Sequence, residues 1–172
     1  MYPEILYVMA EDLLDACREN DLTLALAESC TGGLVAGCIT AIPGSSDVLD
    51  RGFVTYTNTS KSQMLGVPSE LFDRVGAVSA EVARAMAEGA TQKSNANIAL
   101  SVTGIAGPGG GTAEKPVGLV YMACARDGME TQVERHVFDP GPGDDEDQRH
   151  RVRIQAVESG LKLLLNCCAA TI

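Results

Sequence analysis

Apolar runs of strand length alternate with segments of helical periodicity along this chain, and the alternation constrains the fold more than any other feature. Residues 22–27 read as a short buried strand after an amphipathic helix over residues 4–19. A second buried strand is predicted over residues 98–102, after a helix that Ser79 can cap and that runs to about Lys93. Helices that alternate with buried strands predict an α/β fold.

The rest of the chain supplies further strands and helices, including one antiparallel pair. A strand is predicted over residues 52–57, and a short helix follows over residues 58–65. The strand-like runs 117–126 and 130–138 are joined by Asp127-Gly128, a pair that readily takes the positive φ of a two-residue hairpin turn. We therefore expect a mixed sheet with one antiparallel hairpin and with helices on both faces.

The C-terminal part of the chain contains an acidic stretch, residues 139–147, which is predicted to be a solvated loop. Apolar residues at helical spacing from Val152 to Leu165 predict a closing helix. No internal repeat or interdomain linker is visible, and 172 residues of which 45% are hydrophobic can bury one sizeable core. We expect a single domain over residues 1–172.

Charge and cysteine usage exclude several classes of function. The formal net charge is −10, so bulk electrostatics would repel a nucleic-acid backbone, and any anionic ligand has to be held locally. The six cysteines form no CxxC pair and there are only two histidines, so no zinc site is predicted and the thiols are expected to be reduced and mostly buried. The N-terminus lacks a signal-peptide pattern and no apolar run reaches membrane-spanning length, so the expected compartment is the cytoplasm.

The turn after the first buried strand, residues 29–33, is a candidate for nucleophilic chemistry. Ser29 ends the strand and a helix over residues 34–42 begins just beyond it, so backbone amides from Thr31 to Gly33 can point toward a group that the serine attacks. One turn would then supply both a nucleophile and an oxyanion site. Spacing alone also fits Ser29 or Thr31 as a simple helix cap, which is the commoner arrangement at a strand-helix junction.

The glycine-rich loop after the second buried strand, residues 103–112, is a second candidate site. A compact domain seldom keeps so flexible a run without using it, and amides such as those of Gly104 and Gly107 can cradle an anion. The loop matches neither the Walker pattern nor the dinucleotide-binding glycine pattern. A flexible surface loop without a ligand is the alternative interpretation.

Lys61 is the best placed base for a serine that has no histidine nearby. A lysine in a partly dry pocket can lose its proton near neutral pH, and Lys61 lies at the start of the helix predicted after Tyr56. An exposed lysine and a half-buried strand tyrosine are the alternatives.

A local cluster of arginines follows the acidic stretch of this otherwise acidic chain. It consists of Arg149, Arg151 and Arg153. One of them can bind a phosphate, or they can pair on the surface with the acidic residues 144–147.

Five strings of residues occur in order along nearly the whole chain. They are Ala27-Glu28-Ser29-Cys30-Thr31-Gly32-Gly33, Tyr56-Thr57-Asn58 with Lys61, Gly76-Ala77-Val78-Ser79, Ser101-Val102-Thr103-Gly104-Ile105-Ala106-Gly107-Pro108-Gly109-Gly110 and Lys115-Pro116-Val117-Gly118. Together they closely resemble the CinA C-terminal-domain family, and the string that begins at Thr103 is very specific. The resemblance implies a three-layer α/β/α sandwich, self-association into a homo-oligomer, and no metal or organic cofactor.

Members of this family are known as nicotinamide-nucleotide amidases, also called nicotinamide mononucleotide deamidases. The resemblance implies that Ser29 is the nucleophile and that Lys61 activates it, with Tyr56 and Thr103 near the reacting group. The expected reaction is hydrolysis of nicotinamide mononucleotide to nicotinate mononucleotide and ammonia. The alternatives are an amidase for another small nucleotide amide and a partner-binding protein without catalysis, associated with competence or DNA damage.

The resemblance also implies one arginine beside the substrate phosphate. Arg149 resembles the arginine that the family carries after its last strand, in a Gly-Asp-Arg triplet. Here the triplet reads Asp147-Gln148-Arg149 after a longer loop, so Arg153 is a competing choice. The expected partners are a small-molecule substrate and a second copy of the chain, without direct nucleic acid or membrane contact.

Overall fold

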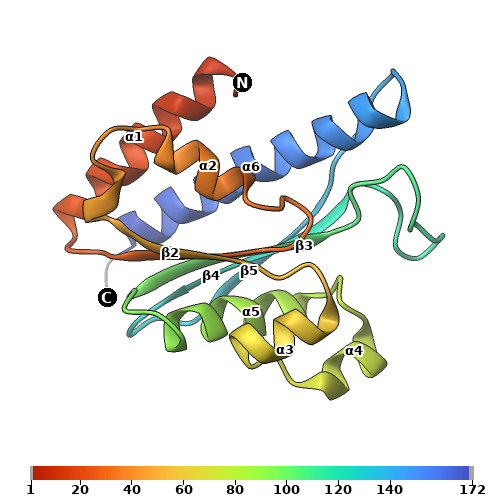
Figure 1. Ribbon diagram of the computed structural model, residues 1–172, viewed down its shortest axis with the longest axis horizontal. Coiled ribbons are helices and arrows are strands. Elements are labelled where there is room, and N and C mark those ends of the chain that lie inside the picture. The colour runs from red at the N-terminus through yellow and green to blue at the C-terminus, as the bar shows by residue number, and fades with distance from the viewer. Residues whose placement is uncertain (1, 171–172) are drawn as a thin grey trace.

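The computed structural model describes residues 2–170, and it shows a central sheet between two layers of helices (Figure 1). One layer consists of α1 (Glu4–Glu19), α2 (Leu34–Thr40) and α6 (Asp145–Ala169). The other layer consists of α3 (Asn58–Leu65), α4 (Ser69–Val75) and α5 (Ala80–Gln92). The expected three-layer α/β/α sandwich is therefore confirmed.

The sheet is mixed, as predicted, with the strand order β2-β1-β3-β4-β5. The strands are β1 (Leu24–Glu28), β2 (Leu49–Val54), β3 (Ile98–Gly104), β4 (Leu119–Arg126) and β5 (Gln132–Val137). β1 pairs in parallel with β2 and β3, whereas β3 with β4 and β4 with β5 are antiparallel. The predicted hairpin is thus β4–β5.

Two element boundaries differ from the prediction for local physical reasons. The predicted strand over residues 52–57 lies earlier, at Leu49–Val54, because Thr57 caps α3 by accepting a hydrogen bond from the Ser60 amide. The acidic stretch is not a loop throughout, because α6 begins at Asp145 and Asp144 caps it. Acidic residues in a first turn complement the positive end of the helix dipole. The sequence analysis also missed α4 and a short 3₁₀ turn over Ser45–Asp47.

The core lies on both faces of the two central strands. β1 is buried along its whole length, and Leu26 and Leu100 pack toward α1, α2 and α6 while Ala25 and Ala99 face the helices on the other side. Glu28 and Val102 are register partners in parallel strands, so the turn after β1 and the loop after β3 begin side by side. In α/β sheets ligands gather at this edge. No helix within residues 2–170 has the length and apolarity to cross a membrane.

Candidate active site

A cavity of about 200 Å³ opens at the carboxyl ends of β1 and β3. It is lined by Ser29, Cys30, Tyr56, Asn58, Lys61, Ala77, Val78, Thr103, Gly104, Ala106 and Arg149. Six of the ten residues predicted for the site line this cavity, namely Ser29, Tyr56, Lys61, Thr103, Gly104 and Arg149. The other four, which are Thr31, Gly32, Gly33 and Gly107, lie outside its lining.

Ser29 and Lys61 are in direct contact inside this cavity. The Lys61 Nζ lies 2.9 Å from the Ser29 Oγ and 2.7 Å from the Thr55 carbonyl oxygen. Lys61 is only 2% exposed, and within residues 2–170 it forms no ion pair. A buried ammonium without a carboxylate partner is costly, so the neutral amine is favoured.

Burial lowers the pKa of Lys61, because desolvation disfavours the charged ammonium, and the neighbouring Cys30 acts in the opposite direction. A neutral amine has two hydrogens and one lone pair. One N–H can stay on the Thr55 carbonyl, and the lone pair can then accept the Ser29 hydroxyl proton. This arrangement suits Lys61 as a general base for Ser29.

Glu28, and not Ser29 or Thr31, holds the start of α2. Glu28 is 1% exposed, and its carboxylate accepts hydrogen bonds from the amides of Gly33, Val35 and Ala36 at 2.9, 3.1 and 2.9 Å. The helix-cap interpretation of Ser29 and Thr31 is therefore wrong, since α2 has no capping bond from its own N-cap residue, and Glu28 leaves the serine hydroxyl free for chemistry.

The amides predicted for an oxyanion site need a correction. The Gly33 amide donates to Glu28, and the Gly32 amide donates to the Ser29 carbonyl at 3.0 Å, so neither is free for a ligand. Among residues 2–170 no acceptor takes the amides of Cys30 and Thr31. Of the three predicted donors only the Thr31 amide has no acceptor, and the Cys30 amide, which was not predicted, is the second such amide of the turn.

Ser29 and Cys30 are the two residues of this turn that line the cavity. Thr31 is fully buried and its Oγ1 has no hydrogen-bond partner within residues 2–170. The Cys30 thiol lies against the cavity, and burial raises the pKa of this thiol to about 12. Cys30 therefore stays protonated, and of the two side chains Ser29 is the better candidate nucleophile.

Arg149 closes one side of the cavity. Its guanidinium donates to the Tyr56 hydroxyl and to the Gly107 carbonyl, each at 2.6 Å. Tyr56 is 56% exposed, so this contact lies at the mouth of the cavity. Gly107 lies outside the lining but positions Arg149 through its carbonyl, a role different from the predicted amide cradle.

The other two arginines of the cluster bind carbonyl groups elsewhere. Arg151 donates to the Pro140 and Pro142 carbonyls, and Arg153 donates to the Cys30 and Thr31 carbonyls. Within residues 2–170 none of the three pairs with an acidic residue, so the surface ion-pair alternative is wrong. Of the two arginines that competed for the substrate phosphate, Arg149 is the one that lines the cavity.

The segment between α4 and α5 forms another part of the cavity wall, through Ala77 and Val78. Thr103 donates from its Oγ1 to the Ala77 carbonyl at 2.9 Å, and Lys115 donates to the Val75 and Val78 carbonyls at 2.6 and 2.7 Å. Thr103 thereby fixes the wall instead of offering a free hydroxyl. The sequence gives no local signal for this role of Lys115, because its partner Val75 lies forty residues away in the chain.

Sequence reasoning missed two further residues of the site. Glu28 organises the turn after β1 and Asn58 lines the cavity, and neither was predicted as a site residue. An acidic residue that ends a fully buried strand is an unusual choice, and this burial was the one available signal for Glu28.

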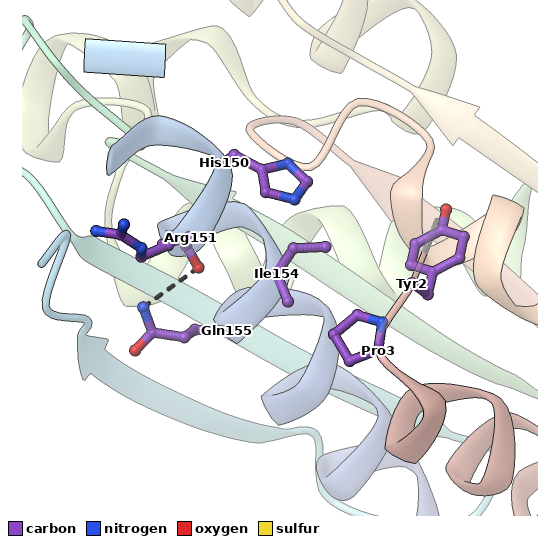
Figure 2. Close-up of a pocket in the computed structure, with 6 residues that line it drawn as sticks. All are labelled: Tyr2, Pro3, His150, Arg151, Ile154 and Gln155. Carbon is purple, nitrogen blue, oxygen red and sulfur yellow. Dashed lines mark hydrogen bonds between the residues drawn. The ribbon is translucent and has the colours of Figure 1, made fainter. Parts of the chain in front are cut away.

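A larger cavity of about 560 Å³ lies between the N-terminal residues and α6. Figure 2 shows His150, Ile154 and Gln155 from α6 on one side, with Tyr2 and Pro3 facing them on the other. It contains no nucleophile in contact with a base, so it is a poor candidate for covalent chemistry. The described residues also include no group of three or more side chains arranged to hold a metal ion.

Comparisons with known proteins agree with this architecture. The family model described as the CinA C-terminal domain matches residues 6–168. A CinA-like protein from Geotalea uraniireducens is 51% identical over 96% of this chain and 40% of its own length. A putative competence-damage inducible protein from Caldicellulosiruptor bescii is 50% identical over 72% of this chain and 30% of its own length. The chain thus spans two fifths or less of these relatives.

Solved structures match over nearly their full length. Competence/damage inducible protein CihA from Agrobacterium tumefaciens is 44% identical, with a TM-score of 0.89 over 96% of this chain and 98% of that chain. A CinA superfamily protein from Escherichia coli is 30% identical, with a TM-score of 0.86 over 97% of this chain and 94% of that chain. The fold and the order of the sequence strings are therefore shared with these proteins.

Proposed function

The chain belongs to the CinA C-terminal-domain family, and from this membership and the geometry of the site we propose that it is a nicotinamide-nucleotide amidase. The proposed reaction converts nicotinamide mononucleotide and water to nicotinate mononucleotide and ammonia. One observation carries the proposal, which is the 2.9 Å contact between Ser29 Oγ and the buried Lys61 Nζ. A serine next to a desolvated lysine is an arrangement for acyl transfer.

In the proposed mechanism, neutral Lys61 accepts the Ser29 proton while the serine oxygen bonds to the carboxamide carbon. The amide of Cys30, the residue of the turn that lines the cavity beside Ser29, stabilises the oxyanion that forms. The C–N bond then breaks, and Lys61 returns the proton to the nitrogen, which leaves as ammonia. Water attacks the acyl ester with Lys61 again as base, and Ser29 regains its proton as nicotinate mononucleotide leaves.

The size of the cavity supports a substrate that is only partly enclosed. Its volume of about 200 Å³ is below the roughly 300–1,000 Å³ of sites that enclose a drug-sized ligand. We propose that the pyridine carboxamide enters this cavity and that the ribose phosphate stays at its mouth. Arg149 lies there, and a guanidinium is a strong phosphate donor.

The test is a coupled ammonia assay with nicotinamide mononucleotide on purified protein. Ser29→Ala should lower kcat by at least about 10³-fold, because the Cys30 thiol that lines the same cavity stays protonated and cannot replace the serine. Ser46→Ala is the matched control, since Ser46 is exposed and outside the cavity. Near-normal turnover by the Ser29 variant would remove Ser29 from the mechanism.

Two further outcomes separate the alternatives. Faster turnover of a different nucleotide amide would keep the chemistry and change the substrate. Intact wild-type protein that releases no ammonia from any of these amides would favour a partner-binding role, in line with the competence-damage names of several relatives. Homo-oligomerisation is also part of the proposal, and sedimentation of the purified protein measures it.

A further inference from the structure

Asn58 is the first residue of α3 and lines the cavity that holds Ser29 and Lys61. It lies one helical turn before Lys61, so both residues are on the same face of the helix. Lys61 is buried, whereas Asn58 is exposed and also borders a neighbouring hollow of about 280 Å³ between α3 and α4. Asn58 therefore lies at the mouth of the catalytic cavity.

The local structure of α3 does not use the Asn58 side chain. Thr57 caps the helix through a reciprocal pair of hydrogen bonds with Ser60. The other side-chain bonds of α3 are those of Lys61 and Ser62, so within residues 2–170 both polar groups of Asn58 are left without a partner. Asparagine is also a weak helix former. Neither capping nor helix formation accounts for this residue.

The remaining amide and hydroxyl side chains of the cavity already have partners. The Tyr56 hydroxyl accepts from Arg149, and the Thr103 hydroxyl donates to a backbone carbonyl. The Ser29 hydroxyl contacts the lysine amine. Among the amide and hydroxyl side chains that line the cavity, Asn58 is thus the one whose donor and acceptor have no partner within residues 2–170.

The chemistry of the proposed substrate indicates which part Asn58 can bind. The carboxamide has to reach Ser29, which is buried, and the phosphate is an anion that the Arg149 guanidinium binds better than a neutral amide does. The ribose, which links the two, has adjacent hydroxyl groups that both donate and accept. The carbonyl oxygen and the NH₂ group of an asparagine are complementary to such a diol.

The surroundings of Asn58 also suit a neutral group. Among the described residues, those that line the neighbouring hollow are all uncharged, namely Asn58, Thr59, Ser62, Gln63, Ser69 and Phe72. On the other side of the mouth, the hollow that Arg149 borders is lined mainly by charged residues, namely Asp144, Glu146, Asp147, Arg149, His150 and Arg153. A phosphate finds a cation on the Arg149 side, and the side of Asn58 is left to the neutral sugar.

We propose that Asn58 is a specificity-determining residue that forms hydrogen bonds with the ribose hydroxyls of the substrate. This inference rests on the proposed function and deepens it, because it assigns the sugar to a side chain of its own. The contact of Asn58 depends on the ribose and is independent of the phosphate, whereas the contact proposed for Arg149 depends on the phosphate.

The kinetic test compares Asn58→Ala with wild type on three pyridinium amides. They are nicotinamide mononucleotide, nicotinamide riboside, which lacks the phosphate, and methylnicotinamide, with a methyl group in place of the ribose. Loss of one or two neutral hydrogen bonds should lower kcat/KM by about tenfold for the mononucleotide and the riboside. For methylnicotinamide, kcat/KM should stay within about twofold of wild type, since no ribose contact is lost.

Asn166→Ala is the matched control, because Asn166 is also an exposed asparagine on a helix and lies outside the cavity. It should match wild type on all three compounds. Circular dichroism verifies the fold of each variant.

Asn58→Asp adds a readout that a merely structural role would not give. A carboxylate can accept a hydrogen bond from a ribose hydroxyl, as in dinucleotide-binding sites. For the riboside, kcat/KM should therefore stay closer to wild type in Asn58→Asp than in Asn58→Ala. Equal losses in the two variants would contradict a bond to the sugar.

Binding measurements separate this inference from the proposed function. Calorimetry with the mononucleotide, the riboside and methylnicotinamide gives Kd without hydrolysis. Wild-type protein that binds the riboside but releases no ammonia contradicts only the proposed reaction, and the Kd values of Asn58→Ala still judge the ribose contact. An equal loss for all three compounds, a loss confined to the mononucleotide, or no loss would overturn the inference. A wild-type protein that neither hydrolyses nor binds them contradicts both.

Discussion

Two glycine-rich segments follow neighbouring strands of the sheet, yet the protein holds them in opposite ways. The turn over residues 29–33, after β1, is bonded through Glu28, Arg153 and its own backbone, and it carries Ser29, the proposed nucleophile. The loop over residues 105–118, after β3, is bonded mainly near its ends, and Gly109 to Gly111 are exposed.

The difference teaches that glycine content is a poor guide to chemistry. Its glycine content made the longer loop a candidate site, but of residues 105–118 only Ala106 lines the cavity, beside Gly104 at the end of β3. The short turn contains fewer glycines and more fixed peptide groups. Catalysis requires donors that are already aligned, so density of hydrogen bonds distinguishes the two segments better than flexibility does.

Lys61→Met should have the largest effect of the substitutions that test the turn. Loss of a general base lowers kcat by about 10²–10⁴-fold. Because burial lowers the pKa of Lys61, wild-type activity should rise with pH as the amine deprotonates. The residual activity of the variant should not show this rise. A pH-rate profile that is unchanged in the variant would contradict the proposed role of Lys61 as the base for Ser29.

The same substitution has a consequence for stability. A lysine with a lowered folded-state pKa binds a proton more weakly than in the unfolded chain, so folding stability rises with pH between the two pKa values. Lys61→Met removes that contribution. Urea denaturation of both proteins across this pH window should show the Met variant as the relatively more stable one at the lower pH.

Glu28→Gln tests whether the turn is held as firmly as the contacts indicate. The amide offers one acceptor oxygen where the carboxylate offers two, so at least one of three buried N–H donors loses its partner. We expect a loss of about 1–3 kcal/mol in the free energy of unfolding, together with lower kcat. A variant as stable and active as wild type would mean that the turn does not depend on this anion.

Arg149→Met tests the contribution of the longer loop. The Gly107 carbonyl of this loop holds Arg149, so removal of the arginine tests the proposed phosphate contact. We expect KM for nicotinamide mononucleotide to rise by about tenfold, the effect of one charge-assisted hydrogen bond of roughly 1.5 kcal/mol. The riboside, which lacks the phosphate, should show little change, and an equal loss for both substrates would contradict the phosphate role.

Gly109→Ala should have the smallest effect. An added Cβ at Gly109 meets nothing within 4 Å, whereas Gly33 in the turn has a φ of +97° that strains any other residue. We expect Gly109→Ala to change the free energy of unfolding by less than about 0.5 kcal/mol, and Gly33→Ala to cost about 1–2 kcal/mol. Similar losses of unfolding free energy in the two variants would contradict the view that the turn is held more tightly than the loop.

The sequence was sufficient for the fold because the fold depends on local periodicity. Apolar runs of strand length located β1 and β3, and the Asp127-Gly128 turn located the hairpin. The prediction of a loop over the whole acidic stretch was wrong at its C-terminal end. There Asp144 accepts hydrogen bonds from the Glu146 and Asp147 amides and starts a helix.

The site was less accessible from sequence. Ser29 and Lys61 stood out as a pair through the family resemblance, and their proposed roles stay predictions until measured. The partners of Glu28 and Arg153 are backbone groups brought close by the fold, and Arg153 contacts residues more than a hundred positions away. A hydrogen bond to a backbone atom does not require a particular residue type at the partner position. Such bonds therefore leave no pattern in the sequence from which they can be predicted.

The strand order also determines when the pocket can become complete during folding. β1 lies between β2 and β3, and Leu24 of β1 stands opposite Ile98 of β3. Parallel pairing between segments so distant in the chain is slow, because loop-closure entropy is lost before the new contacts compensate for it. The β1–β2 pairing can bring Ser29 and Lys61 together early, but a folding chain has an unfinished pocket until β3 docks and Thr103 secures its wall.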